Sequence, residues 1–196
     1  MDIIFASNNS GKIREVRTIF KDIADFNLYS LGDIGVTIEV VEDKETFKEN
    51  AMKKALEVYA VVKKPVIAED SGLCVDALDG RPGVYSHRYY ANLEDGNQKL
   101  LDELKVVPFE KRNAYYIAVL CYFDGKNLLF STGTCSGKIG FREEGNNGFA
   151  YDKIFFLEDY RKTMAQLSDD EKNRISHRRK ALDEMKNILL GEHRRD

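Results

Sequence analysis

The sequence has few of the features that mark several common protein classes. It contains three cysteines and three histidines in 196 residues, and its formal net charge is only −3. Cys74, Cys121 and Cys135 are odd in number, lie in apolar stretches and lack the spacing of metal ligands. We therefore expect them to be small buried side chains in a reducing compartment, without a disulfide, metal-binding or catalytic role.

Other features that the sequence lacks argue against further classes of protein. No apolar stretch approaches the roughly 20 residues of a membrane span, and residues 1–6 carry no basic region of the kind that opens a signal sequence. The small negative net charge gives no general attraction for nucleic acid or for an anionic membrane. No histidine stands beside a cysteine or in a G-x-S-x-G setting, so no nucleophile-and-base pair is predicted. We expect a cytoplasmic protein with no nucleic-acid partner and no membrane partner.

The apolar pattern predicts a mixed α/β protein. Hydrophobic residues make up 43% of the chain, and a chain of this length buries about 70% of its extended-chain surface without a disulfide or metal. The predicted strands are residues 2–6, two short segments within 26–40 (the clearer at 36–40), 65–70, 113–123, 127–137 and 149–156. The predicted helices are residues 13–20, 46–62, 93–104 and 168–189, with Ser176 as a point where the last helix can restart. No linker or repeat interrupts this order, which predicts one domain over residues 1–196.

The stretch SNNSGK (residues 7–12) joins a predicted strand to a predicted helix. Backbone N–H groups and the helix dipole attract anions at such a junction, and Lys12 adds a positive charge. The stretch is not a Walker A loop, because the first glycine is missing and Ile13 follows the lysine. It predicts a phosphate-binding loop, with an ordinary capped turn and a solvated Lys12 as the alternative.

Two acids, Glu69 and Asp70, stand at the end of the predicted strand PVIAED (residues 65–70). Strand alternation places them on opposite faces, and the phase alone does not say which one faces a site. A second carboxylate must come from elsewhere, and VVEDKE (residues 40–45) is the nearest acid-rich stretch. Mg²⁺ takes one or two carboxylates and completes its shell with water and substrate phosphates, so the acids predict a magnesium site. The alternative is a solvent-facing acid followed by a turn.

Two later stretches contain candidate ligand-binding side chains. In GNNGFAYD (residues 145–152), Phe149 and Tyr151 fall on one face of the predicted strand, directly after a glycine-rich loop. Such a pair can stack on a planar base, at roughly 1–3 kcal/mol per base, or can pack in the core. EKNRISHRRK (residues 171–180) gathers basic residues around a Ser-His-Arg triplet, which indicates either donors aimed at a ligand or a solvated helix face.

Taken in order, five motifs resemble those of the inosine triphosphate pyrophosphatases: SNNSGK, TFKENA, AEDSGLCVDALDGRPGVYSHRY, GNNGFAYDKIF and EKNRISHRRKAL. These are house-cleaning enzymes that hydrolyse dITP, ITP and XTP to the monophosphate and pyrophosphate with Mg²⁺. The resemblance spans Ser7 to Leu182. It implies a mixed twisted sheet with flanking helices, two lobes around a long substrate cleft, and a homodimer. The alternatives are a purine-nucleotide-binding regulator without catalysis and a nucleoside triphosphatase that releases orthophosphate.

The resemblance also implies a role for each matching residue. Asp70 would be the catalytic acid–base residue and a metal ligand, with Glu42 as the second metal ligand. The implied substrate-binding residues are Ser7, Asn8, Asn9, Ser10, Gly11, Lys12 and Lys54 at the phosphates, Ser71 at the substrate, Phe149, Ala150, Tyr151 and Asp152 at the base and sugar, and Lys172, His177 and Arg178 over the purine. Donation from His177 and Arg178 to a 6-oxo group would favour hypoxanthine and xanthine over adenine. Ala150 and Lys153 depart from the usual Gly and Pro of this motif.

Overall fold

Seven strands form one sheet in a computed structural model that describes residues 1–21, 26–91 and 96–192. The strand order is β2-β1-β3-β4-β5-β6-β7. The strands are β1 (Asp2–Phe5), β2 (Asn27–Ser30), β3 (Val66–Val75), β4 (Asn113–Phe123), β5 (Leu128–Ile139), β6 (Phe155–Leu157) and β7 (Lys162–Thr163). The sheet is mixed, because β1 pairs in parallel with β2 and β3, whereas β6 pairs antiparallel with β5 and β7. The predicted mixed sheet with flanking helices is confirmed.

The chain divides into two compact units. The first contains residues 1–70, 118–133 and 177–196, and the second contains residues 71–117 and 134–176. The helices are α1 (Ser10–Phe20), α2 (Phe47–Val62), α3 (Ser86–Ala91), α4 (Gly96–Glu103), α5 (Asp169–Ile175) and α6 (His177–Glu192). Within the described ranges, no helix is both long and apolar enough to cross a membrane.

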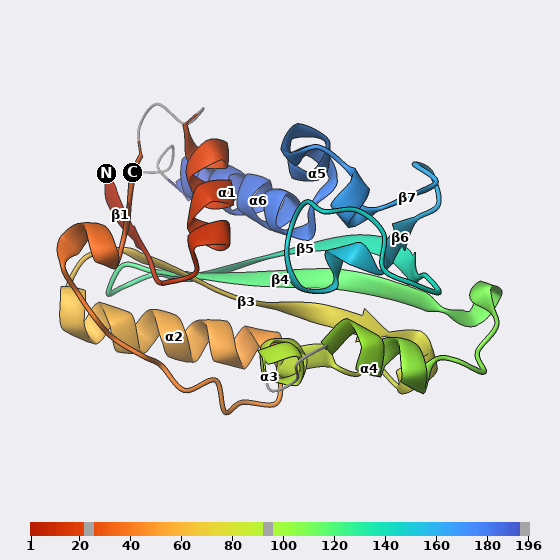
Figure 1. The fold of residues 1–196 in the computed structure, drawn as a ribbon. Helices are drawn as coiled ribbons and strands as arrows, with labels where there is room; N and C mark the ends of the chain where they lie inside the picture. Colours follow the sequence, from red (N-terminus) through yellow and green to blue (C-terminus); the bar gives the residue numbers. More distant parts are fainter. Residues whose placement is uncertain (22–25, 92–95, 193–196) are drawn as a thin grey trace. The chain divides into compact units, whose positions relative to one another are not determined.

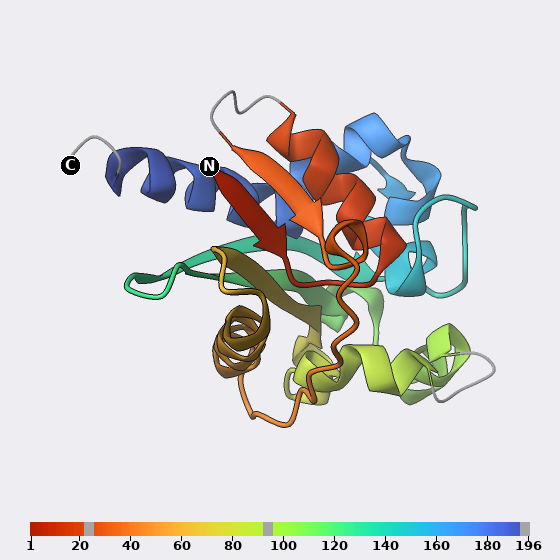
Figure 2. The ribbon, with the colours of Figure 1, turned by 90° about the vertical axis from the view of Figure 1, so that its left-hand side faces the viewer.

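In the first unit, helices cover both faces of the sheet. Helices α1 and α6 lie together on one face, and α2 lies along the other (Figures 1 and 2). The α1 and α6 side has a continuous apolar core of Ile3, Phe5, Val16, Ile19, Phe20, Phe26, Ile67, Ala118, Leu120, Tyr122, Ala181, Leu182, Met185 and Leu189. The two faces matter for the site because neighbouring residues of a strand point to opposite faces.

The N-terminus of α2 follows from its sequence. Thr46 is the N-cap, since its side-chain oxygen accepts from the backbone N–H of Glu49, at the first residue of the helix predicted over 46–62. Ala51, Ala55 and Val58 recur at helical spacing and are buried. This arrangement fixes the rotation of α2, and therefore the direction of the polar side chains beside that apolar stripe.

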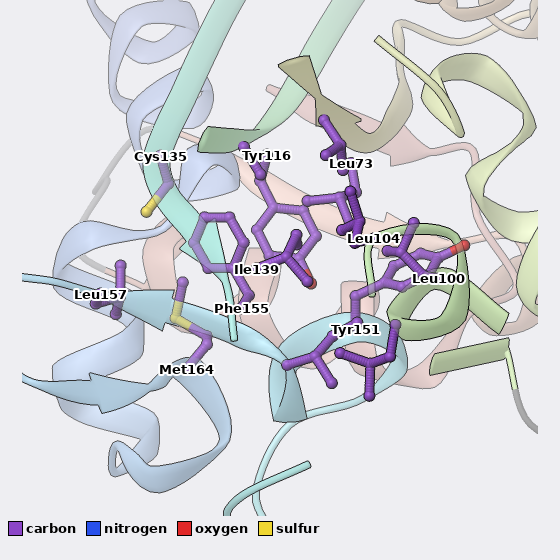
Figure 3. Packing of buried hydrophobic residues seen from close by; sticks show 14 of the residues in the cluster. Leu73, Leu100, Leu104, Tyr116, Cys135, Ile139, Tyr151, Phe155, Leu157 and Met164 are labelled. Atoms are coloured by element: carbon purple, nitrogen blue, oxygen red, sulfur yellow. The ribbon is translucent and has the colours of Figure 1, made fainter. Parts of the chain in front are cut away.

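The second unit has its own core (Figure 3). Tyr116 of β4 and Phe155 of β6 pack with their ring centroids 4.6 Å apart, and Leu100 and Leu104 belong to the same cluster. Cys135 also lies in this core, and all three cysteines are buried, as predicted.

Several element bounds differ from the sequence prediction. Helix α1 begins at Ser10, three residues early, because the Asn9 side chain caps the backbone N–H of Lys12. Residues 36–40 are not a strand; their side chains alternate between exposed and half-buried, and none of the strands in the described part of the chain pairs with them. The strand predicted to end at Asp70 continues to Val75, since Leu73 and Val75 extend its buried apolar pattern.

The later elements show one further correction. The predicted strand at 149–156 is instead a short 3₁₀ helix, η5 (Ala150–Lys153), followed by β6. The predicted strand at 113–123 has the predicted bounds, and the predicted break at Ser176 separates α5 from α6. The predicted helix at 93–104 corresponds to α4, and Leu93 lies outside the described residues.

Gly133 of β5 lies directly against the first turns of α6. A Cβ added there would stand 2.1 Å from the His177 carbonyl oxygen and 2.4 Å from the Ala181 backbone nitrogen. We expect Gly133→Ala to lower the free energy of unfolding by about 1–3 kcal/mol, because the strand and helix must separate. Urea titration checks this. Gly191→Ala in α6 is the control, since no atom of the described residues lies within 4 Å of its added Cβ and alanine favours the helix. Equal losses in both variants would contradict the steric account.

Candidate active site

The two acids of β3 point to opposite faces of the sheet, as the strand alternation predicts. Asp70 faces α2, where it accepts a hydrogen bond from Asn50 Nδ2 at 2.9 Å. Glu69 faces α1 and α6, where it contacts Lys12 and Arg178. The structure therefore gives each buried carboxylate its own set of partners, and it assigns the α2 side to Asp70.

Asp70 is only 4% exposed and its environment makes it more basic than an ordinary aspartate. Burial raises the pKa of Asp70 to about 6, and the nearby negative charge of Glu42 adds to this effect. The positive charge of Lys54 and the Asn50 hydrogen bond act in the opposite direction without cancelling it. A carboxylate of this kind is ionised at neutral pH and still accepts a proton more readily than a solvated one.

Lys54 connects Glu42, the second predicted metal ligand, to strand β3. Its Nζ donates to Glu42 Oε1 and to the backbone carbonyl oxygen of Glu69, the latter at 2.9 Å. Lys54 lies on α2, four residues after Asn50, so the two side chains share one helix face. Glu42, Lys54 and Asp70, which the sequence assigned to the metal and phosphates, are thus brought together in the first unit.

Arg178 at the start of α6 is the centre of a buried ionic network. Its Nε and Nη2 donate to both carboxylate oxygens of Glu69, at 2.7 and 2.9 Å, and its Nη1 donates to Glu15 of α1. Arg178 is 2% exposed. Burial opposes its charge, but the two carboxylates more than offset this, so the pKa of Arg178 is raised. Lys12 Nζ lies 3.1 Å from Glu69 Oε1, which ties the N-terminal loop to the same network.

The loop before α1 has the features of an anion-binding turn. Asn9 accepts from the backbone N–H of Lys12 at 3.0 Å, and the Asn9 backbone N–H donates to Ser7 Oγ at 3.2 Å. Asn8 and Ser10 are exposed, and Gly11 is half-buried. No acid lies in the first turn of α1, so the positive end of the helix dipole is not offset there.

The donor set of the first unit fits a divalent cation of the magnesium type. Glu42 and Asp70 lie close enough for the charge of one to raise the pKa of the other, which is the usual state of two carboxylates sharing a cation site. Among the described residues, no three or more metal-binding side chains cluster together. Two carboxylates are nevertheless sufficient for Mg²⁺, which fills its remaining positions with water and substrate phosphates.

A second group of predicted residues lies in the second unit. Asp152 of η5 is buried and accepts from Lys172 Nζ at 2.7 Å, from the Phe149 backbone N–H at 2.9 Å, and from Tyr116 Oη at 3.2 Å. Lys172 Nζ lies 4.7 Å from the centroid of the Phe149 ring. Phe149 is 43% exposed, so its ring is available to a planar ligand beside the ammonium group.

The predicted pairing of Phe149 with Tyr151 on one strand face is wrong. Tyr151 is 2% exposed, packs in the core of the second unit, and donates through Oη to the Ser86 carbonyl oxygen at 2.8 Å (Figure 3). The cause is the left-handed backbone of Ala150, with φ of 51°, which turns the chain into η5 and separates the two rings.

The remaining predicted residues have less distinct surroundings. Ser71 follows Asp70 in β3 and is half-buried, and His177 opens α6 with a buried side chain. Sequence reasoning missed Asn50, Glu15 and Tyr116, which hold Asp70, Arg178 and Asp152 in place. Asn50 lies within the TFKENA motif, one helical turn before Lys54, and that spacing was the only signal of its role.

Comparisons with known proteins show which sequences and structures this chain resembles. The model of the Ham1 family matches residues 3–188. The chain is 42% identical to the dITP/XTP pyrophosphatase of Shouchella clausii and 43% identical to that of Clostridium perfringens; these matches cover 96–97% of this chain and 97% of each relative. The solved structure of the Staphylococcus aureus Ham1 protein superposes with a TM-score of 0.87 at 38% identity, covering 98% of this chain and all of that one.

Proposed function

Because this chain belongs to the Ham1 family, we propose that it hydrolyses the purine nucleoside triphosphates dITP, ITP and XTP to the monophosphate and pyrophosphate. The names of its relatives support the substrate class. The observation that carries the proposal is the buried Asp70 carboxylate, with its raised pKa, beside Glu42 and Lys54. This arrangement is suited to activating water next to a phosphate.

We assign the proton transfer to Asp70. Its carboxylate accepts a proton from the water that attacks the α-phosphorus, and the raised pKa makes this transfer more favourable than for a solvated aspartate. Asn50 Nδ2 donates to the Oδ2 atom of Asp70 at 2.9 Å, which fixes the orientation of the carboxylate. Pyrophosphate then departs as the leaving group.

We assign neutralisation of the phosphate charge to the lysines of the first unit. Lys12 and Lys54 each have three ammonium protons, so each can donate to a phosphate oxygen while keeping a bond to its carboxylate. Asn8, Ser10 and Gly11 supply backbone N–H groups at the start of α1, since the Ser7 and Asn9 N–H groups donate within the loop. Glu42 and Asp70 would hold Mg²⁺, which when bound neutralises charge on the phosphate oxygens as it develops.

We assign binding of the purine base to Phe149 and Lys172. The half-exposed Phe149 ring offers a stacking surface, and Lys172 Nζ is a hydrogen-bond donor without acceptor capacity. A 6-oxo group accepts one of the ammonium protons that Asp152 does not take, whereas the 6-amino group of adenine offers no acceptor there, at a cost in affinity. Base recognition by His177 and Arg178 stays a prediction from the resemblance; the Arg178 donors described above are directed at Glu69 and Glu15. A single functional domain, a homodimeric state and a cytoplasmic location also stay predictions.

Product analysis tests the proposal. Incubation with dITP and Mg²⁺ should release pyrophosphate and dIMP, with slower turnover of ATP than of ITP or XTP because the 6-amino group of adenine offers no acceptor to Lys172. Ion chromatography separates pyrophosphate from orthophosphate. Orthophosphate as the first product would indicate attack at the γ-phosphorus, and binding without products would indicate a regulator. Either result would replace the proposed function.

A further inference from the structure

The backbone that presents Phe149 is in a conformation that its sequence disfavours. Ala150, directly after Phe149, has φ of 51°, which is the left-handed region where a Cβ meets the following carbonyl. A residue other than glycine persists there only when its surroundings hold it. Some contact in the second unit must therefore supply this constraint.

The side chain of Asn97, on α4, makes one such contact. Asn97 is 1% exposed, and its Nδ2 donates both to the Ala150 carbonyl oxygen, at 3.3 Å, and to Glu143 Oε1. Its Oδ1 has no hydrogen-bond partner among the residues that the structure describes. Rotating the amide by half a turn would direct this oxygen at two acceptors, so the orientation is fixed by Ala150 and Glu143.

Glu143 extends the contact to the other end of η5. Its Oε2 lies 3.3 Å from Lys153 Nζ, and the neighbouring Glu144 backbone N–H donates to the Lys153 carbonyl oxygen at 2.9 Å. Asn97 and Glu143 thus hold η5 at its first and last residues.

We propose that Asn97 is a positioning residue for substrate binding, which holds the Ala150 peptide in its left-handed conformation and so keeps the Phe149 ring beside Lys172. This rests on the proposed function, because it assumes that Phe149 stacks on the base. Asn97 touches no reacting atom in this account. It affects the affinity for the nucleotide, while Asp70 and Lys54 in the first unit carry out the chemistry.

Steady-state kinetics with dITP test the proposal in the intact protein. Asn97→Ala should raise KM about tenfold and leave kcat within about twofold, since a misdirected ring loses part of its stacking. Adding Ala150→Gly to Asn97→Ala should bring KM most of the way back to the wild-type value, because glycine adopts the left-handed conformation without help from Asn97. Gln98→Ala, at the exposed neighbouring position of α4, is the matched control and should behave as the wild type. A cavity effect alone would not respond to Ala150→Gly, so an unrescued KM overturns the proposal.

Hydrogen exchange provides a readout that needs no nucleotide. Amides of residues 143–153 should exchange faster in Asn97→Ala than in the wild type or Gln98→Ala, because η5 loses its clamp. Unchanged exchange in that segment overturns the proposal even if KM rises. If the wild type releases no pyrophosphate from dITP, the proposed function fails, and the exchange result alone then decides whether Asn97 holds η5.

Discussion

Replacing Asp70 by asparagine is expected to lower the turnover of dITP by about 10²–10⁴-fold, the usual contribution of a general base. Asparagine keeps the size of the side chain and can still accept the Asn50 hydrogen bond, but it takes no proton from water. Pyrophosphate release at saturating dITP measures the effect. Asp159→Asn, at an exposed position, is the matched control. An Asp70→Asn protein that turns over dITP at a near-normal rate would remove Asp70 from the mechanism.

The same variant should be no less stable than the wild type, which separates loss of chemistry from loss of fold. Folding raises the pKa of Asp70 from 3.8 to about 6, so the folded state binds the proton more tightly than the unfolded state. The wild type therefore loses up to about 3 kcal/mol of stability as pH rises from 4 to 7, because a tenfold difference in proton affinity between the two states corresponds to about 1.4 kcal/mol. The asparagine side chain does not ionise, so we expect equal stabilities near pH 4 and a more stable variant near pH 8, in urea titrations with a chelator present.

Replacing Arg178 by alanine is expected to lower the free energy of unfolding by about 3–5 kcal/mol. The substitution leaves Glu69 and Glu15 buried with no guanidinium between them. Urea unfolding measures the loss. Arg179→Ala is a closely matched control, because the neighbouring Arg179 pairs with Asp183 at a partly exposed site of the same helix. Such a pair contributes only about 0.3–0.5 kcal/mol, so similar losses in both variants would contradict the buried-network account.

A combined variant separates the charge effect from the loss of packing. Arg178→Met together with Glu69→Gln and Glu15→Gln keeps most of the volume and removes all three charges. Buried ionic groups replaced by neutral groups of similar size often cost little or even stabilise. We therefore expect this triple variant to recover most of the stability lost in Arg178→Ala. A triple variant as unstable as Arg178→Ala would show that packing, not uncompensated charge, is the main contribution.

The sequence correctly predicted those helices and strands for which capping residues and apolar periodicity indicate the same structure. The helix N-caps at Thr46 and Ser168, the apolar stripe of α2 and the bounds of β4 follow from side-chain periodicity and from hydrogen bonds within four residues. The ordered motifs were sufficient to identify the family, since five matches in sequence order are far more specific than one. Local signals failed at residues 149–156, where the left-handed Ala150 is held by Asn97, a residue 53 positions away.

The candidate site also combines features that the local sequence predicts with features that only the tertiary structure determines. Alternation along β3 determined that Glu69 and Asp70 point to opposite faces, because that depends only on backbone geometry. Which partners lie on each face was decided by the tertiary structure, because α2 brings Lys54, with its partner Glu42, to the side of Asp70, while α1 and α6 bring Glu15 and Arg178 to Glu69. Charge pairing in a buried site depends on distances between residues up to 163 positions apart in the chain, and no pattern within a single segment encodes them.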